Sequence, residues 1–87
     1  MYSFEFDSKK SESNQKKHGI DFVEAQAIWQ DTDFIEIVAR SDDEPRALVV
    51  GMIDGKHWSA IITYRGDKIR IISVRRSRDS EVALYEG

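Results

Sequence analysis

Three strand-like segments separated by short turns constrain the fold of this chain more than any other feature. Residues 46–53 and 58–64 are rich in aliphatic and aromatic side chains, and Asp54-Gly55, a pair typical of hairpin turns, lies between them. Gly66-Asp67 then separates 58–64 from a last segment, 68–75. Strands joined by such short turns run antiparallel. The sequence therefore predicts an antiparallel meander with the mainly apolar segment 46–53 in a central position.

A short strand and a polar helix are expected ahead of this meander. Residues 2–6 alternate aromatic and polar side chains, which predicts a strand at a sheet edge. Asp7 or Ser8 can cap a helix that runs through Lys17. Gly19 follows where a left-handed residue would end that helix.

A second helix is expected to pack on the sheet. Asp21 and Glu24 are spaced as in a capping box. An apolar stripe at helical spacing follows, made of Phe22, Ala25, Ile28 and Trp29. The stripe predicts that Trp29 is buried against the sheet.

The remaining elements complete a single α+β domain over residues 1–87. Residues 34–40 alternate as a half-buried strand, 41–45 form a polar turn with the only proline, and Asp79 caps a short helix through Glu86. A chain of 87 residues with 40% hydrophobic side chains can close one small core. We expect an antiparallel sheet of about four strands packed with two N-terminal helices and a short C-terminal helix.

Several classes of function are excluded by what the sequence lacks. Without cysteine there is no disulfide scaffold, iron–sulfur cluster or cysteine-ligated zinc. No phosphate-binding glycine loop or nucleophile elbow is present, and neighbouring acids at Asp42, Asp43 and Glu44 are interpreted as a solvated turn. No metal site and no cofactor are therefore expected. The chain has no apolar leader or membrane-length segment, so we expect a cytoplasmic protein without a membrane partner.

Charge is distributed unevenly along the chain. Residues 21–54 hold nine acidic side chains against two arginines, a local balance of −7, although the whole chain carries only −3. Residues 65–78 hold six basic side chains against one acid, and 9–17 hold four against one. If the fold joins the basic segments, one face suits a polyanion and another suits a basic partner or water. The alternative is ordinary solvated surface charge.

Arginines gather at the end of the last predicted strand. Simple alternation places Arg70 and Arg76 on one face and Arg75 on the other. Guanidinium groups suit phosphate oxygens, and an RNA-cleaving site without metal needs such cations together with groups that move protons. The alternative is ion pairing with the acidic segment. His18 at a helix end can exchange protons near neutral pH or cap helix carbonyls.

A set of motif residues with characteristic order and spacing extends from position 6 to position 85. They are Phe6-Asp7, Lys10, Asn14, Lys17-His18-Gly19-Ile20, Phe22, Ala25, Trp29, Asp31, Arg46, Thr63-Tyr64-Arg65, Arg70-Ile71-Ile72-Ser73, Arg75, Glu81 and Tyr85. Together they resemble the BrnT toxin family over nearly the whole chain. Phe6 stands where that family usually has tryptophan, and Ser77 where it often has alanine.

The resemblance implies a bacterial type II toxin with a RelE-like ribonuclease fold. It also implies a BrnA-type antitoxin partner, whose own ribbon-helix-helix domain binds promoter DNA, so that this chain meets DNA only indirectly. The motif positions carried over as catalytic candidates are Lys10, His18, Arg46, Arg75, Glu81 and Tyr85. The expected RNA-binding residues are Lys17, Arg65, Arg70, Arg76 and Arg78.

The leading hypothesis is a metal-independent endoribonuclease that leaves a 2′,3′-cyclic phosphate. Arg75 and Arg70 would hold the scissile phosphate, and Lys10 would add positive charge. His18 or Glu81 would handle protons. The alternatives are a non-catalytic RNA- or ribosome-binding module that uses the same basic face, and a subunit that only binds a protein partner.

Overall fold

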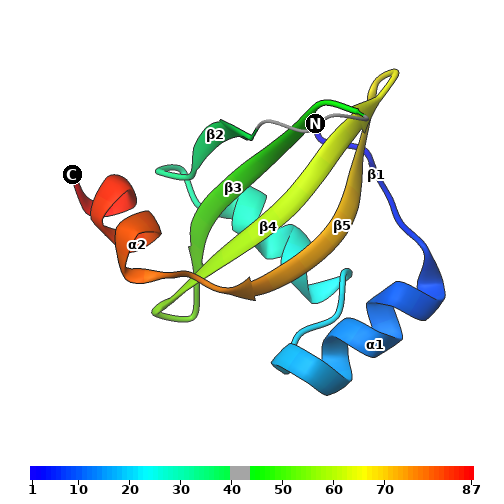
Figure 1. Cartoon of the computed structure of the whole chain (residues 1–87), viewed down its shortest axis with the longest axis horizontal. Helices are drawn as coiled ribbons and strands as arrows, with labels where there is room; N and C mark the ends of the chain where they lie inside the picture. The colour runs from blue at the N-terminus through cyan, green and yellow to red at the C-terminus, as the bar shows by residue number, and fades with distance from the viewer. Residues whose placement is uncertain (40–43) are drawn as a thin grey trace.

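A computed structural model describes residues 1–39 and 44–87 (Figure 1). The elements in chain order are β1 (Phe4–Glu5), α1 (Ser8–His18), the 3₁₀ helix η1 (Glu24–Gln30), β2 (Ile35–Ala39), β3 (Arg46–Ile53), β4 (Lys56–Arg65), β5 (Lys68–Arg76) and α2 (Asp79–Glu86). Most of the predicted turn 41–45, the acids Asp42 and Asp43, and Arg40 at the end of a predicted strand lie outside the described residues. No helix in the described ranges has the length and apolar character needed to span a bilayer.

The strands form one five-stranded sheet in the order β1-β5-β4-β3-β2. The four long strands pair antiparallel, as predicted, and β1 pairs parallel to β5 through Phe4↔Ile69 and Glu5↔Arg70. The expected four-stranded antiparallel sheet is therefore corrected to a five-stranded mixed one. The alternation in residues 2–6 indicated an edge strand, but it carries no information on the direction of a partner more than sixty positions away.

One face of the sheet carries the hydrophobic core. Phe22 and Ile28 are fully buried and Trp29 is 6% exposed, against sheet residues such as Val49 and Ile62. Figure 1 shows η1 lying behind the central strands. Burial of Trp29 was predicted correctly, as was the capping box, in which Glu24 N donates to Asp21 Oδ1 at 2.8 Å and Asp21 N to Glu24 Oε1 at 3.1 Å.

The second helix is a 3₁₀ helix of seven residues rather than the expected α-helix. It lies very close to β3, because a Cβ built on Gly51 would stand 2.9 Å from Ile28 Cγ2. Glycine at this strand position is what permits the approach. The apolar stripe in the sequence predicted which side of this segment is buried, but it did not predict that the helix is 3₁₀ rather than α.

The first helix begins and ends where predicted, and it packs along β5. Asp7 accepts hydrogen bonds from Lys9 N and Lys10 N, and Gly19 ends the helix with φ 78°. From the middle of α1, the buried Asn14 amide donates to Val74 O at 2.9 Å and accepts from Val74 N at 3.1 Å. Asn14 therefore satisfies backbone groups of β5 beyond the end of β1.

Candidate active site

A β-bulge in β5 decides which arginines share a face. Ile61 pairs with Ser73 and Ile62 with Ile71, so Ile72 is an extra residue on β5. An inserted residue reverses the alternation of side chains beyond it. Arg70 and Arg75 consequently project from the same face, and the expectation that Arg70 shares a face with Arg76 is wrong.

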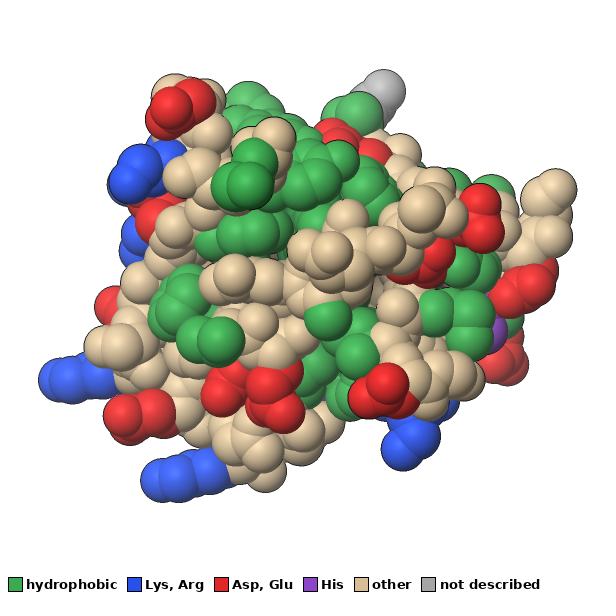
Figure 2. All heavy atoms as spheres, turned by 180° about the vertical axis from the view of Figure 1, so that it is seen from behind, with side chains coloured by type: hydrophobic (Ala, Val, Ile, Leu, Met, Phe, Trp, Pro, Cys, Tyr) green, Lys and Arg blue, Asp and Glu red, His purple; other side chains and the backbone are tan. Residues whose placement is uncertain are grey.

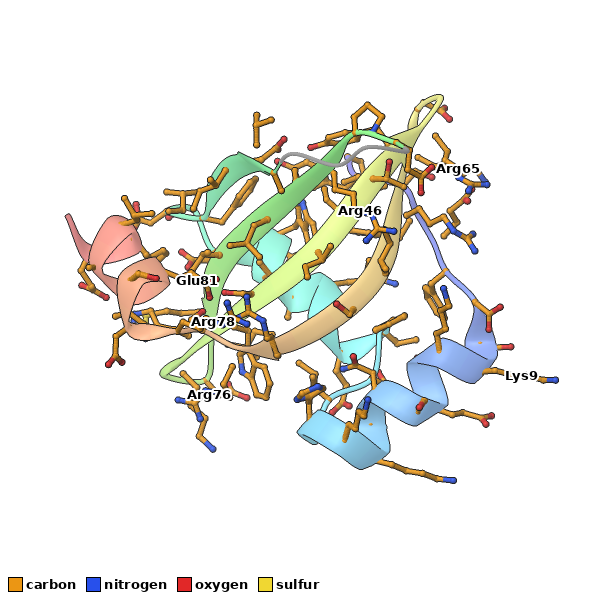
Figure 3. The ribbon with its side chains drawn as sticks, viewed as in Figure 1. Lys9, Arg46, Arg65, Arg76, Arg78 and Glu81 are labelled. Atoms are coloured by element: carbon orange, nitrogen blue, oxygen red, sulfur yellow. The ribbon has the colours of Figure 1, made fainter. Side chains whose placement is uncertain are left out.

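This face, opposite the core, is named the open face, and its side chains form three rows across the sheet. The first row is Ile35, Val50, Ser59 and Arg75; the second is Ile37, Leu48, Ile61 and Ser73; the third is Ala39, Arg46, Thr63 and Arg70. Helix α2 packs over the first row, where Val50 is fully buried. In the second row, Leu48 and Ile61 are only half-buried. The open face thus has a mainly apolar second row between two rows that hold arginine, Arg75 in the first and Arg46 and Arg70 in the third. Figure 3 labels Arg46 toward one end of the sheet and Glu81, the partner of Arg75, toward the other.

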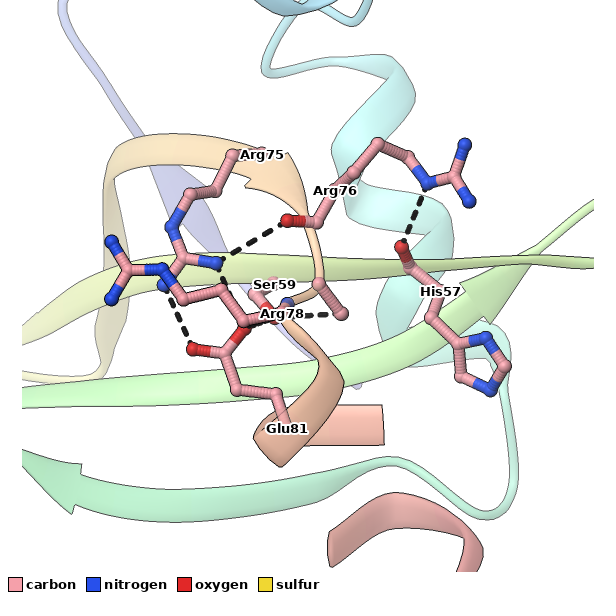
Figure 4. Close-up of polar contacts among 7 residues, drawn as sticks. His57, Ser59, Arg75, Arg76, Arg78 and Glu81 are labelled. Carbon is pink, nitrogen blue, oxygen red and sulfur yellow. Dashed lines mark hydrogen bonds and ion pairs between the residues drawn. The ribbon is translucent and has the colours of Figure 1, made fainter. Parts of the chain in front are cut away.

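Arg75 forms a two-armed ion pair with Glu81 of α2 (Figure 4). Its Nη1 and Nη2 donate to Glu81 Oε1 and Oε2, each at 2.8 Å. Glu81 Oε1 also accepts from Ser59 Oγ and from Arg78 N, both at 2.8 Å. Glu81 is 7% exposed, and such a buried carboxylate requires this dense set of donors.

Two serines extend this cluster. Ser59 Oγ and Ser77 Oγ lie 2.7 Å apart. Because the Ser59 hydroxyl proton points to Glu81, the Ser77 hydroxyl is the donor to Ser59. Ser59 was not a predicted site residue. Its place beside Arg75 follows from strand register, which a single sequence does not display.

The charges of the pair are strongly stabilised. The hydrogen bonds from Arg75, with those from Arg78 N and Ser59, lower the pKa of Glu81 to about 2. The hydrogen bond to Glu81 raises the pKa of Arg75 in turn. At neutral pH, Glu81 is therefore ionised and, while paired, a weak base.

Tyr85 holds the other end of α2 to the body of the protein. Its hydroxyl donates to Asp31 Oδ2 at 2.5 Å, and the same oxygen accepts from Met52 N at 2.8 Å. The bond to Asp31 raises the pKa of Tyr85 to about 12, so the phenol stays protonated. Asp31 was part of the resemblance, but no role was predicted for it. Nearby, His57 Nε2 lies 2.7 Å from Glu86 Oε2.

The remaining predicted residues lie in four places on the molecule. Arg46, Arg65 and Arg70 lie toward the other end of the open face, where Arg70 pairs with Glu5 at 3.0 Å and Arg65 reaches Glu44 at 4.0 Å. Arg76 projects from the opposite face, with its guanidinium 5.5 Å from the centre of the Trp58 ring. Arg78 is exposed at the start of α2.

Lys10, Lys17 and His18 are exposed on α1. Among the interactions of the described residues, none joins these three side chains to Arg75 or Glu81. The bonds of Asn14 to Val74 do bring α1 alongside β5, so the two basic segments of the chain adjoin at this edge. In residues 1–39 and 44–87, no group of three histidine or acidic side chains could hold a metal ion.

Comparison with known proteins connects these features to one family. A family model described as the ribonuclease toxin BrnT of type II toxin–antitoxin systems matches residues 6–81. The matched span contains the bulge, the three rows and both members of the Arg75–Glu81 pair. No curated protein matches the chain.

Proposed function

The chain belongs to the BrnT family of ribonuclease toxins of type II toxin–antitoxin systems, and from this premise we propose that it is a metal-independent, RelE-like endoribonuclease. A type II toxin has a protein antitoxin, and we assign that role to a BrnA-type protein. The RNA strand lies along the open face, with its scissile phosphate at Arg75. The enzyme acts in the cytoplasm and meets DNA only through its antitoxin.

The observation that carries this proposal is the shared face of Arg75, Arg70 and Arg46. Ser59 and Thr63, their neighbours on β4, are four residues apart, which separates the two arginine rows by roughly 13 Å. A short stretch of single-stranded RNA can contact both rows. The half-buried Leu48 and Ile61 between them offer an apolar surface to the bases.

Arg75 is suited to the charge that develops during cleavage. A guanidinium fork that matches a carboxylate also matches two phosphate oxygens. Binding of RNA would exchange Glu81 for the scissile phosphate at the same two nitrogens. Arginines then supply the positive charge that stabilises the pentacovalent phosphorane, and this is why we propose that no metal ion is required.

The same exchange would prepare Glu81 for proton transfer. Its low pKa is caused mainly by the hydrogen bonds from Arg75. When Arg75 turns to the phosphate, that pKa rises, and a carboxylate with a higher pKa accepts the 2′-hydroxyl proton more readily. The 2′-oxygen then bonds to phosphorus as the bond to the 5′-oxygen breaks, and the leaving 5′-oxygen takes a proton from water or from a second acid. Tyr85 is a weaker candidate for proton transfer because its hydroxyl is engaged with Asp31. His18 or Lys10 would have to approach from α1.

Cleavage of labelled single-stranded RNA in excess EDTA tests the proposal. We expect cleavage to persist and to leave 2′,3′-cyclic phosphate ends. Cleavage that stops in EDTA and returns with Mg²⁺ would contradict metal independence. A gel shift without cleavage would instead support the non-catalytic RNA-binding module.

A matched pair of arginine variants tests whether cleavage takes place at Arg75 on the open face. Arg75→Lys keeps a cation beside Glu81 but loses the two-armed fork, so cleavage should fall by about 10²–10³-fold. Arg76→Lys makes the same change at the next residue on the opposite face and should stay within a few-fold of wild type. Equal losses in the two variants would refute the assignment to the open face. His18→Gln should cleave normally if Glu81 is the base.

A further inference from the structure

A hollow of about 410 Å³ lies on the face opposite the proposed RNA site. Its walls come from the N-terminal segment, η1, β2 and the β4–β5 turn. Tyr64 lines the hollow. Its neighbours on β4, Thr63 and Arg65, project from the open face, so the side chain of Tyr64 projects from the opposite face. Figure 2 shows hydrophobic side chains gathered on this side of the molecule, with acidic and some basic side chains at their margin. The hollow has the size of pockets that hold small ligands.

Aromatic rings form much of its surface. The rings of Tyr2 and Phe34 lie edge to face with their centres 6.1 Å apart, and those of Trp29 and Phe34 are tilted with their centres 6.4 Å apart. Trp29 is 6% exposed, but Tyr2 and Tyr64 are 50% and 53% exposed. Large aromatic side chains that remain this accessible around a hollow can receive a flat or cationic group on their faces.

The charged side chains in the lining are all acidic. Glu36 and Asp67 contribute carboxylates, and the described lining holds no lysine or arginine; its one cationic group is the α-ammonium of the exposed Met1. Tyr64 Oη donates to Glu36 Oε1 at 2.6 Å, which orients that carboxylate and leaves Oε2 available. Glu36 also belongs to segment 21–54, whose charge balance is −7.

We propose that this hollow receives an arginine side chain of a protein partner. A guanidinium can stack on the exposed tyrosine rings and donate to the Glu36 carboxylate, which matches both the aromatic and the acidic character of the lining. A nucleotide could use the rings, but its phosphates would meet Glu36 and Asp67. Because the hollow and the open face are on opposite sides of the sheet, this inference is independent of the proposed RNA cleavage.

Titration of the full chain with acetyl-arginine amide, followed by NMR, tests the inference. We expect saturable shifts of the Trp29 indole and Tyr64 ring resonances. Glu36→Gln preserves an acceptor for Tyr64 while removing the charge, and should weaken binding about three- to fivefold. Glu12→Gln, the same change on α1, is the matched control and should bind as wild type. Tyr2→Ala removes one aromatic wall and should also weaken binding.

Four outcomes would overturn the assignment. Uridine could shift these resonances at lower concentration than the arginine probe, which would identify a base-binding pocket. The arginine probe could bind wild type and Glu36→Gln equally, or it could bind neither. RNA cleavage should be unchanged in Glu36→Gln, and a large loss would place the hollow within the RNA site and refute a separate partner site.

Discussion

Glu81 is the buried, charged residue that joins α2 to the sheet in the proposed site. It connects α2 to β4 through Ser59 and to β5 through Arg75, so the same carboxylate stabilises the fold and occupies the guanidinium that RNA would need. In the proposed mechanism, a group with these two roles would limit the reactivity of the free toxin. The phosphate would have to displace the Glu81 carboxylate from Arg75 before the site is complete.

Stability should depend on Glu81 in acid. Its pKa is lowered from 4.5 to about 2 in the folded protein, so the ionised form favours folding. The contribution is fully present above about pH 4.5 and is lost as the pH falls towards 2. Its size is on the order of 3 kcal/mol at most.

Urea unfolding of wild type and Glu81→Gln across this range measures the effect. The variant should lose stability at neutral pH and show a flatter dependence between pH 4.5 and pH 2. Glu12→Gln, which changes an exposed carboxylate on α1, is the control and should retain the wild-type dependence. Parallel curves for wild type and Glu81→Gln would contradict the assigned pKa.

The elements differ in what holds them to the sheet. The 3₁₀ helix η1 is held by buried apolar side chains, whereas α2 is held by polar contacts at Glu81, Tyr85 and Glu86. Apolar burial responds little to pH, but carboxylate contacts weaken in acid. We therefore expect α2 to loosen before η1 as the pH is lowered.

Removing the largest apolar side chain of η1 should destabilise the whole domain. Trp29 packs edge to face on Phe4 at 4.9 Å and is 6% exposed, so Trp29→Ala should cost about 3–5 kcal/mol. Val23→Ala, at a 63% exposed position just ahead of η1, should cost about 0.5 kcal/mol or less. Thermal unfolding of both variants checks this, and equal midpoints would show that Trp29 does not anchor the core.

At the scale of the whole molecule, the two faces of the sheet differ in the side chains that they carry and in the roles that we propose for them. The open face carries the arginine rows proposed to contact RNA, and the opposite face carries the core and the acidic, aromatic hollow. The acidic segment 21–54 contributes Glu36 to the hollow, and the basic segment 65–78 contributes Arg70 and Arg75 to the open face. A partner could bind at the hollow without contacting the proposed cleavage site.

We expect the free toxin to be monomeric and its complex with a BrnA-type antitoxin to contain two copies of each chain. Ribbon-helix-helix domains dimerise to bind DNA, so each antitoxin dimer would carry two toxins. Light scattering on the co-purified complex measures this stoichiometry. A particle with one copy of each chain would contradict the expectation.

The sequence by itself determined the elements whose signals are local. Short turns predicted the antiparallel order of β3, β4 and β5, and alternation predicted the strand at β2. Asp7 and Gly19 marked the ends of α1, and the stripe through Trp29 predicted the buried side of η1. Each signal lies within a few residues of the structure it specifies. The family resemblance, also read from sequence, agrees with the family model over residues 6–81.

Only the tertiary structure decided how those elements meet. The parallel pairing of β1 joins residues more than sixty positions apart, and the pairing of Arg75 with Glu81 requires α2 to fold back over Ser59. The bulge at Ile72 moved Arg70 to the face of Arg75, because one inserted residue reverses a period of two. Strand alternation is a local rule, whereas register depends on contacts with another strand, and the arginine face is a consequence of register.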